Sequence, residues 1–323
     1  MVHGSRCEIG FVVVTFNSER YIRACIESIY HHPPAGLSFR VVVVDNASDD
    51  GTLRILAELQ REFDDLAVIS PGANVGFGLA NNLGFAALTA RYYVLVNHDA
   101  RLIGDNVSPV ISAMQKDGAI AICGLPLVFP DGSPQTYAYP FSSGHKWLLQ
   151  LLGIRTAVAW CLRFPELAPI IRHFPYGREF STNQSRKPLN LEEVSPADCR
   201  GAVHAVDWVC AAAMVIDGEF LGQSRGFDPA IFLYGEDEDL CIAAQRQGRR
   251  VVTIDTMPVV HDFGWGRNRF NRAIADHKYI SLVYFIQKNV HHDLDRILMR
   301  LLLPFHVYGF KRFFYAFRAR GKR

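Results

Sequence analysis

Four consecutive carboxylates stand directly before an apolar segment, in the stretch YGEDEDLCIAA. They are Glu236, Asp237, Glu238 and Asp239. Charges this close together raise the pKa of at least one member, and a carboxylate with a raised pKa suits a general base. Acidic residues also stabilise the first turn of a helix, but that role accounts for only part of the cluster. We interpret the cluster as a functional base or a carboxylate beside a metal ion, with helix capping as the alternative.

Polar residues also stand at the ends of three apolar, β-branched runs. The runs are IGFVVVTF, FRVVVV and YYVLV, and the polar residues at their ends are Thr15, Asn17 and Glu19, then Asp45, Asn46 and Ser48, then Asn97, His98 and Asp99. In an open parallel sheet such ends face one crevice, where ligands bind. Helix caps and turns favour the same residue types and explain Asn17 and Ser48 equally well. Asp45 and Asp99, directly after buried strands, are predicted to be functional.

A histidine lies at a further predicted strand end. His261 follows the run MPVV and precedes the glycine-containing loop DFGWG, after which come Arg267, Arg269 and Arg272. Arginine side chains match phosphate oxygens in geometry and charge, so the combination suits a metal-bound diphosphate. A purely structural histidine is the alternative at this position.

Several common nucleotide and hydrolase motifs do not occur. The first predicted strand is followed by TFNSER and not by GxGxxG, which argues against a dinucleotide-dependent dehydrogenase. The sequence contains no GxxxxGK[ST] and no HExxH, so P-loop and zincin chemistry are not indicated.

The candidate site residues are positioned by helices and strands that are predicted to alternate along the chain. Apolar spacing predicts helices over 18–30, 52–63, 81–90 and 238–247, and a strand over 250–254. Strands alternating with helices predict a mostly parallel sheet with helices on both faces. Unbroken apolar strands predict burial on both faces. The polar segment 165–206 is predicted to be a surface insertion.

The composition is that of a globular protein. The chain has 323 residues, 49% of them hydrophobic and 20% charged, which excludes disorder as the main state. No apolar run approaches the roughly 20 residues of a membrane span, and we expect no signal peptide at the N-terminus. The seven cysteines form no CxxC pair, so we expect free thiols in a reducing cytosol.

Charge is unevenly distributed along the chain. The net charge is +2, but residues 296–323 hold eight Lys or Arg and no Asp or Glu, which leaves 2 − 8 = −6 for the rest. Seven aromatic residues interleave with this basic charge, and Pro304 and Gly309 are expected to break any long helix there. Basic and aromatic residues together favour an anionic membrane surface. Alternatives are a solubilising terminus and nucleic-acid binding, and the acidic body argues against nucleic acid.

The motifs together resemble one enzyme family. The chain contains, in this order, VVVTFNSERYI, VVVVDNASDDGT, NVGFGLANNLG, LVNHDA, PDGSPQ, VDWVCAAAMVI, GFDPAIFLYGEDEDLC and VVHDFGWG. This order resembles family 2 glycosyltransferases, and most closely the bacterial rhamnosyltransferase-like branch, over roughly residues 9–290. The resemblance implies an α/β fold of GT-A type, with a Rossmann-like, mostly parallel sheet flanked by helices. It divides residues 1–290 into a nucleotide-sugar half up to about 125 and an acceptor half from about 126, followed by the tail 291–323.

The resemblance also implies roles for individual residues. Asp237, with Glu236 beside it, matches the catalytic base, and Asp99 and His261 match positions near a bound Mg²⁺ or Mn²⁺. Matching nucleotide-sugar positions are Thr15, Asn17, Glu19, Asp45, Asn46, Asn74, Gly76, Asn81, Asn97, His98 and Arg267. Trp208 and Asp207 are assigned to the acceptor. Asn97 and His98 depart from the family's metal motif, and Tyr137 and Tyr139 stand where related sequences often have an arginine.

The implied reaction is an inverting sugar transfer. A hexose such as rhamnose would pass from dTDP or UDP to the hydroxyl of a lipid-linked or growing cell-surface glycan. The protein would lie on the cytoplasmic face of the inner membrane and take part in cell-envelope polysaccharide synthesis. Three other hypotheses remain: a catalytically inactive nucleotide-sugar-binding subunit, a nucleic-acid-binding protein, and a sugar nucleotidyltransferase.

Overall fold

The computed structural model describes residues 7–152, 188–191, 193–196, 199, 201–262 and 272–308. The chain forms two compact units, residues 1–140 with 188–269, and residues 141–187 with 270–323. The expected boundary at residue 290 lies inside the second unit. Arg267 and the first part of the expected insertion, 165–187, lie outside the described residues.

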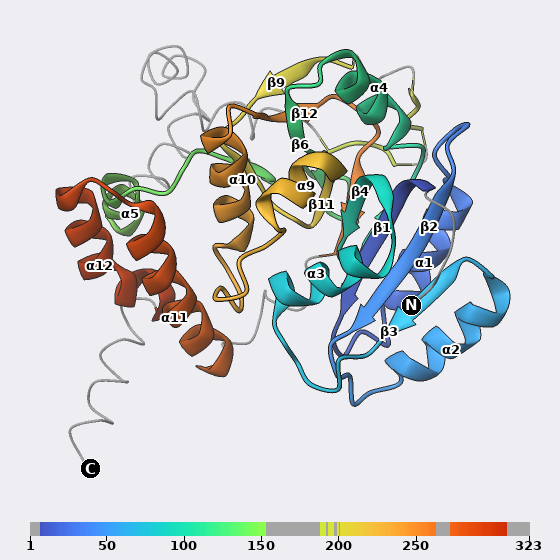
Figure 1. The fold of residues 1–323 in the computed structure, drawn as a ribbon, viewed down its shortest axis with the longest axis horizontal. Coiled ribbons are helices and arrows are strands. Elements are labelled where there is room, and N and C mark those ends of the chain that lie inside the picture. Colours follow the sequence, from blue (N-terminus) through green and yellow to red (C-terminus); the bar gives the residue numbers. More distant parts are fainter. Residues whose placement is uncertain are drawn as a thin grey trace. The chain divides into compact units, whose positions relative to one another are not determined.

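The first unit is built on an eight-stranded sheet (Figure 1), whose order is β3-β2-β1-β4-β11-β6-β12-β9. Its strands are β1 (Cys7–Thr15), β2 (Phe39–Asp45), β3 (Leu66–Ile69), β4 (Ala90–Val96), β6 (Ile120–Gly124), β9 (Val203–Ala205), β11 (Ala213–Asp217) and β12 (Arg250–Ile254). β1 to β4 are mutually parallel, whereas β11 runs antiparallel to both β4 and β6. The predicted mostly parallel α/β sheet is confirmed.

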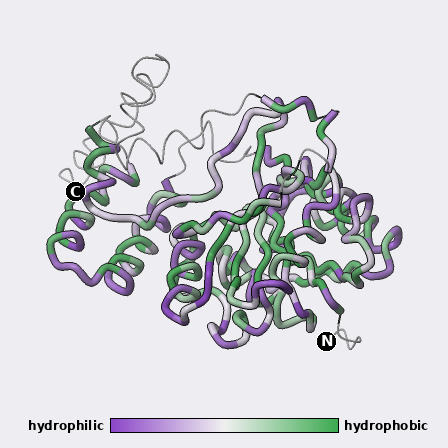
Figure 2. The backbone as a smooth tube through the Cα atoms, turned by 90° about the horizontal axis from the view of Figure 1, so that it is seen from above, coloured by the Kyte–Doolittle hydropathy of each residue, from purple (hydrophilic) through white to green (hydrophobic). Residues whose placement is uncertain are grey.

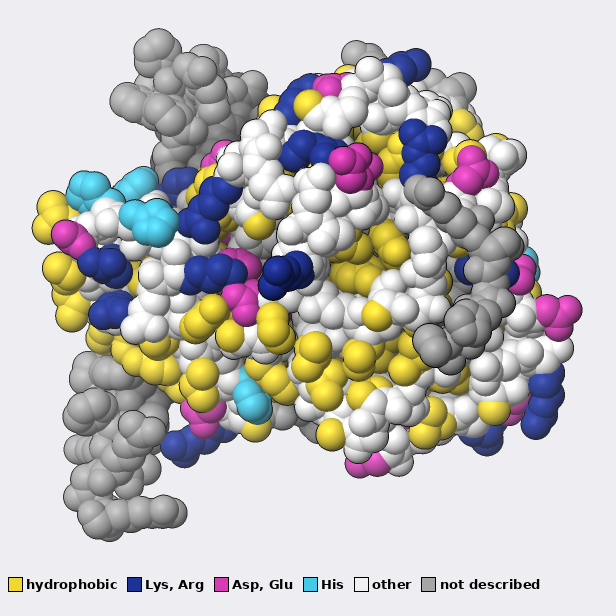
Figure 3. Space-filling model, viewed as in Figure 1, with side chains coloured by type: hydrophobic (Ala, Val, Ile, Leu, Met, Phe, Trp, Pro, Cys, Tyr) yellow, Lys and Arg dark blue, Asp and Glu magenta, His cyan; other side chains and the backbone are white. Residues whose placement is uncertain are grey.

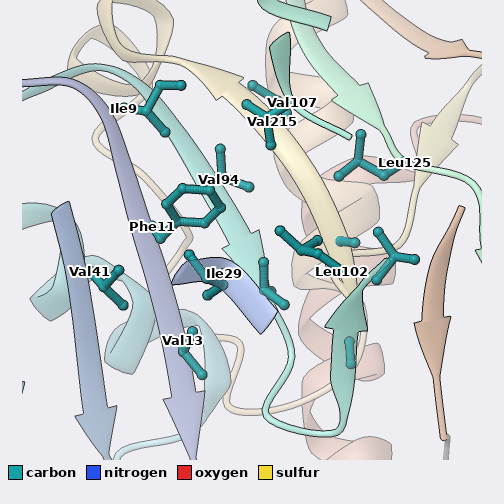
Figure 4. Close-up of a cluster of buried hydrophobic side chains, with 14 of the residues drawn as sticks. Ile9, Phe11, Val13, Ile29, Val41, Val94, Leu102, Val107, Leu125 and Val215 are labelled. Carbon is teal, nitrogen blue, oxygen red and sulfur yellow. The ribbon is translucent and has the colours of Figure 1, made fainter. Parts of the chain in front are cut away.

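The strands of this sheet bury side chains on both faces, as their unbroken apolar sequences predict. In β1, Phe11 and Val13 pack with buried side chains of α1 (Ile22–His31), α2 (Thr52–Glu62) and α4 (Ser108–Lys116). Figure 4 shows part of this cluster. On the other face, Val12 packs with side chains of α3 (Phe77–Ala87), α9 (Gly218–Ser224) and α10 (Glu236–Arg246). Each fully buried aliphatic side chain contributes roughly 1.5–3 kcal/mol, so these faces hold the strand ends in place. Figure 2 shows hydrophobic residues concentrated in the interior of this unit.

Three helices begin at different residues from those expected. The helix expected from Ser18 begins at Ile22, because Ser18 O closes a turn with the N–H groups of Tyr21 and Ile22. The side chain of Asn17 instead accepts a hydrogen bond from Asp49 N. The third helix is 77–87 instead of 81–90, and α10 begins at Glu236 instead of 238. In both of these cases a glycine with positive φ, 87° and 101° respectively, precedes the helix.

Two small sheets complete the first unit. One joins β5 (Ala100–Leu102), β13 (Val259–His261) and β7 (Leu127–Val128), and the other pairs β8 (Ala138–Tyr139) with β10 (Trp208–Val209). β13 runs antiparallel to β5, with His261 opposite Ala100. This register brings the last residue of β13 beside the turn that follows β4.

The second unit is helical, with α5 (Gly144–Leu151), α11 (Arg272–Asn289) and α12 (Asp293–Tyr308). The expected break at Pro304 is wrong, because α12 continues through it to Tyr308. Burial of Met299 and Leu303 and the stacking of Trp147 on His306, with ring centroids 4.3 Å apart, hold this helix in place. Among the described residues, no helix is both long enough and apolar enough to cross a membrane.

Candidate active site

The ends of β1 and β2 carry two buried polar groups. Thr15 and Asp45 are register neighbours, and neither is exposed. Asp45 Oδ2 accepts a hydrogen bond from Ser48 N at 3.1 Å. Asp45 Oδ1 and Thr15 Oγ1 have no hydrogen-bond partner within the described part of the chain. Because an unsatisfied buried polar group costs about 1–3 kcal/mol, a donor group of a ligand would stabilise this pair.

Asn17 and Glu19 tie together the loops that follow these two strands. Asn17 N donates to Ser48 Oγ at 2.8 Å, and Asn17 Oδ1 accepts from Asp49 N at 2.8 Å. Glu19 Oε2 accepts from Gly51 N at 3.2 Å. Asn17 has a φ of 51°, a strained conformation for a residue other than glycine. The structure therefore uses both side chains to hold together the loops that follow β1 and β2.

Asn46 fixes the loop before α3. Its Nδ2 donates to Asn74 Oδ1 at 2.9 Å and to Gly76 O at 3.2 Å, and its Oδ1 accepts from Val75 N at 2.9 Å. Gly76 has a φ of 87°, and a Cβ there would lie 2.4 Å from Phe232 O. This loop is therefore packed against the segment that leads to α10. Asn81, in contrast, is buried, and its side chain donates within α3 to Phe77 O.

Asp99 and His261 come together at the third strand end. His261 Nε2 lies 3.3 Å from Asp99 Oδ1, and the two side chains are only 5% and 8% exposed. Asp262 N donates to Asp99 O at 2.9 Å, which ties the two segments through the main chain. His261 Nδ1 lies 2.9 Å from Gln135 Oε1. The two positions expected near a metal are thus brought side by side.

The charges at this pair suit a divalent cation. Burial by itself raises the pKa of the Asp99 carboxyl, but the hydrogen bond and charge of His261, together with the charge of His98 and a main-chain hydrogen bond, lower the pKa overall. Burial lowers the pKa of His98, whose Nδ1 lies 3.3 Å from Val14 O. Among the described residues, no group of three His, Cys, Asp or Glu side chains could hold a metal. Asp99 and His261 could therefore hold Mg²⁺ or Mn²⁺ only together with oxygens of a ligand or water, which is usual for Mg²⁺ bound to phosphates.

Asp237 lies at the start of α10 with one oxygen held and the other without a partner. Its Oδ2 accepts a hydrogen bond from Ala211 N at 3.0 Å. Its Oδ1 is buried and has no hydrogen-bond partner in the described ranges. Burial raises the pKa of Asp237 to about 6, against the opposing effect of the Ala211 hydrogen bond. A carboxylate with this pKa, and with an oxygen available, can accept a proton near neutral pH.

A short main-chain segment links this carboxylate to the turn after β4. Ala211 N donates to Asp237, and the carbonyl of the next residue, Ala212, accepts a hydrogen bond from Asn97 N at 2.9 Å. Asn97 O in turn accepts from Ala100 N at 2.9 Å. The segment entering β11 therefore positions both Asp237 and the turn that carries Asp99.

The two expected acceptor residues lie at β10. Trp208 stacks on Tyr139, with ring centroids 4.4 Å apart, and its Nε1 donates to Pro140 O at 3.0 Å. The main-chain oxygen of Asp207 accepts from Gln245 Nε2 at 3.1 Å. Tyr139, which stands where related sequences often have an arginine, thus forms half of a partly exposed aromatic pair.

Two residues of this arrangement were not predicted from the sequence. Gln135 lies in the PDGSPQ motif, which marked its position but not its contact with His261. Ala211 acts through its main-chain N–H, a group that nearly every residue type has. Only the fold can identify a contact of that kind.

Comparison with known proteins identifies the family. Residues 11–172, half of the chain, match the sequence profile described as glycosyl transferase family 2. The chain belongs to this family. The resemblance to family 2 glycosyltransferases drawn from the motifs is confirmed.

Relatives include two rhamnosyltransferases. The chain is 24% identical over 257 residues to N-acetylglucosaminyl-diphospho-decaprenol L-rhamnosyltransferase of Mycobacterium tuberculosis, covering 75% of this chain and 74% of the relative. It is 24% identical over 299 residues to the rhamnosyltransferase WbbL of Escherichia coli K12, covering 88% of this chain and 96% of the relative.

Solved structures show that the glycosyltransferase has the GT-A fold. A mannosyltransferase of Pyrobaculum calidifontis, in complex with GDP-Man and Mn²⁺, superimposes with a TM-score of 0.54 at 16% identity, covering 94% of this chain and 70% of that chain. GalNAc-T7 with UDP, GalNAc and Mn²⁺ gives 0.58 at 12% identity, covering 92% and 55%. At such identities the likeness establishes the fold alone.

Proposed function

We propose that this family 2 glycosyltransferase transfers its sugar with inversion, using Asp237 as the base. The observation that carries the proposal is the state of the Asp237 carboxylate. One oxygen is held by Ala211 N at 3.0 Å, and the other is buried without a partner in the described structure. Glu236, also buried, is the competing candidate. Asp237 would take the proton of the acceptor hydroxyl. The oxygen of that hydroxyl would attack the anomeric carbon on the face opposite the departing diphosphate.

The donor is a nucleoside diphosphate sugar with dTDP or UDP as the best candidates. Asp45 Oδ1 and Thr15 Oγ1, both buried and without partners among the described residues, would receive the donor groups of the base. Asn74 and Gly76, held by Asn46, would line the ribose and phosphate side. His98 and Asn97 would lie near the phosphates, and so would Arg267, which is outside the described residues.

Asp99 and His261 would hold a divalent cation, Mg²⁺ or Mn²⁺. Their polar atoms lie 3.3 Å apart in a buried site, and their oxygen and nitrogen donors fit either ion. When bound, such a cation neutralises the charge that develops on the diphosphate leaving group. The protein's own part is to hold Asp99 and His261 together through the Asp262 and Gln135 contacts.

The acceptor is proposed to be a lipid-linked or growing cell-surface glycan, with rhamnose or a similar hexose transferred. The names of the two rhamnosyltransferase relatives support this choice, and one of them names a diphospho-decaprenol acceptor. The Trp208–Tyr139 pair offers an aromatic face for a sugar ring, with Asp207 beside it.

The second unit would bind an anionic membrane surface on the cytoplasmic side of the inner membrane. Leu294, Ile297 and Leu301 are 73%, 55% and 65% exposed. Their spacing of three and four residues places them on one face of α12. Figure 3 shows hydrophobic side chains at the edge of this helical unit with Lys, Arg and His side chains beside them. Together with the basic charge of residues 296–323, this face suits lipid headgroups and their acyl boundary.

A catalytically inactive nucleotide-sugar-binding subunit is the second candidate. The buried oxygen of Asp237 that has no partner among the described residues argues against it, because such a group is costly to retain without a use. The deciding experiment incubates the protein with dTDP-rhamnose and a panel of UDP-sugars, Mg²⁺ or Mn²⁺, and a polyprenyl-diphosphate-linked acceptor. Product formation with an inverted anomeric centre by NMR supports the proposal. Tight donor binding with no transfer and no donor hydrolysis for any sugar would support the inactive subunit instead.

A further inference from the structure

We propose that Gln135 is a positioning residue that fixes the ring of His261, so that His261 Nε2 and Asp99 Oδ1 face one cation. The inference rests on the metal role in the proposed function. Gln135 is 8% exposed and lies after the turn 129–133, where Gln135 N donates to Leu127 O at 2.9 Å. Its main chain is therefore anchored to β7, the neighbour of the strand that ends in His261.

The side-chain amide of Gln135 has a single consistent orientation. Its Nε2 donates to two main-chain carbonyls, Val128 O at 3.3 Å and His261 O. An amide oxygen in that place would face two acceptors, so the NH₂ group must occupy it. Oε1 is thereby directed at His261 Nδ1, 2.9 Å away. The same amide binds both the main chain and the ring of His261.

This orientation determines the tautomer of the ring. Since Gln135 Oε1 can only accept, His261 Nδ1 must carry a proton. In the neutral ring Nε2 then presents its lone pair toward Asp99 Oδ1, 3.3 Å away. Two acceptors that face each other in a buried site require a proton or a cation between them. A histidine with its second nitrogen held by an acceptor is the usual arrangement of a metal ligand.

The main chain around His261 places the residue without orienting its ring. β13 is only three residues long, and its main chain is tied to β5 at Ala100 and to Asp99 through Asp262 N. These main-chain bonds place the backbone of His261 but do not themselves set its χ angles. Gln135 supplies a side-chain contact to Nδ1, on the side of the ring away from Asp99.

The test compares Gln135→Met, which has a similar volume and no amide, with Gln135→Glu, whose carboxyl in its protonated form can donate to one of the two carbonyls and still accept from Nδ1. Asn106→Leu is the matched control. Asn106 is another buried amide that donates to two carbonyls of a neighbouring segment, Met257 O and Pro258 O. The readouts are the Mn²⁺ affinity by EPR in the presence of UDP or dTDP, whichever binds more tightly, and the ¹⁵N spectrum of His261 without metal.

In the wild-type protein without metal we expect His261 Nδ1 to carry a proton, a preference that Gln135 sets. We expect Gln135→Met to lose that preference and to weaken Mn²⁺ binding about 10- to 100-fold. Gln135→Glu should restore most of the affinity, and Asn106→Leu should lower the melting temperature without changing Mn²⁺ affinity.

Other results overturn the inference or its basis. If wild-type protein binds Mn²⁺ and Gln135→Met binds it within about two-fold, the positioning role is wrong while the proposed function stands. A His261 ring whose Nδ1 carries no proton in the wild-type protein would also overturn it. If the wild-type protein with nucleotide binds no Mn²⁺, the metal role in the proposed function is wrong, and the inference falls with it.

Discussion

Asp237 Oδ2 lies 3.0 Å from Ala211 N, and this hydrogen bond holds the carboxylate at the start of α10. The left-handed φ of Gly235, 101°, lets the chain turn directly into the helix at this point. The other carboxylate oxygen is buried and lacks a partner among the described residues. One oxygen is therefore oriented and the second is left for a proton.

Asp237→Asn is expected to lower kcat by about 10²- to 10⁴-fold and to leave donor affinity nearly unchanged. The amide keeps the shape and can still accept from Ala211 N, but it cannot take a proton. The measurements are kcat and nucleotide Kd at one pH. Glu236→Gln and Asp239→Asn serve as comparisons, and Asp239→Asn should mainly affect stability. If Glu236→Gln is folded but inactive while Asp237→Asn is active, the catalytic base is Glu236 and not Asp237.

The pH dependence of catalysis should follow the ionisation of Asp237. Burial raises its pKa from 3.8 to about 6, and the base works only when ionised. We expect kcat/KM to rise with pH and to level off above about pH 7. A rate that stays constant down to about pH 5 would contradict this assignment.

The contribution of Asp237 to the free energy of unfolding should fall as the pH rises, whereas the catalytic rate should increase. Because folding raises this pKa, the stabilising contribution of Asp237 is present below its ordinary pKa of 3.8 and is lost as the pH rises through about 6. Asp237→Asn should therefore unfold less readily than wild type at about pH 8, by on the order of 1–3 kcal/mol. The difference in free energy of unfolding between the variant and the wild-type protein should become smaller as the pH falls to about 4. Urea unfolding of both proteins at the two pH values measures it, and a difference independent of pH would exclude Asp237 as its source.

Asp45→Ala should weaken binding of the nucleoside diphosphate. The loss of a charged hydrogen bond costs about 1.5–3 kcal/mol, roughly a 10- to 150-fold increase in Kd. Asp45→Asn is the matched variant, because it still accepts from Ser48 N and so preserves the loop. Calorimetry with UDP and dTDP measures both variants. If neither affinity changes, Asp45 does not contact the nucleotide.

Asp99→Ala and treatment with EDTA should each abolish turnover, whereas Asn97→Ala should be milder. Asn97 holds the turn through its main chain, with Asn97 N bonded to Ala212 O, and these bonds survive the substitution. Asp99 contributes its side chain to the pair with His261. The assay is nucleoside diphosphate release with and without added Mg²⁺ or Mn²⁺. Full activity in EDTA would exclude a metal requirement. Equal losses of activity in Asp99→Ala and Asn97→Ala would contradict only the expectation that Asp99 matters more than Asn97.

Replacing Leu294, Ile297 and Leu301 with Gln should lower binding to phosphatidylglycerol liposomes by roughly 10-fold or more. Point substitutions are preferable to removing the tail after residue 290, because α12 packs with α5 and α11. Leu53→Gln, at an exposed leucine of α2 in the first unit, is the control. Co-sedimentation measures binding, with donor binding as the check on folding. Equal pelleting of all three proteins would exclude the α12 face.

The sequence by itself determined the sheet and its polar edge. Unbroken runs such as FRVVVV can only be satisfied as strands buried on both faces, and parallel strands place the residues after them at one edge. The order of the residues alone therefore assigns Asp45 and Asp99 to one crevice. Their neighbours Asn17 and Ser48 were equally compatible with structural roles, and the hydrogen bond between Asn17 N and Ser48 Oγ uses both in shaping the loops.

Only the tertiary structure decided which distant groups meet. His261 lies beside Asp99 because β13 runs antiparallel to β5, a pairing of short segments that sequence periodicity does not encode. Gln135 and Ala211 join the site through an amide orientation and a main-chain N–H, neither of which has a sequence signal. Pro304 continues α12, against its local preference. The packing of Met299 and Leu303 outweighs that preference, and packing exists only in the folded chain.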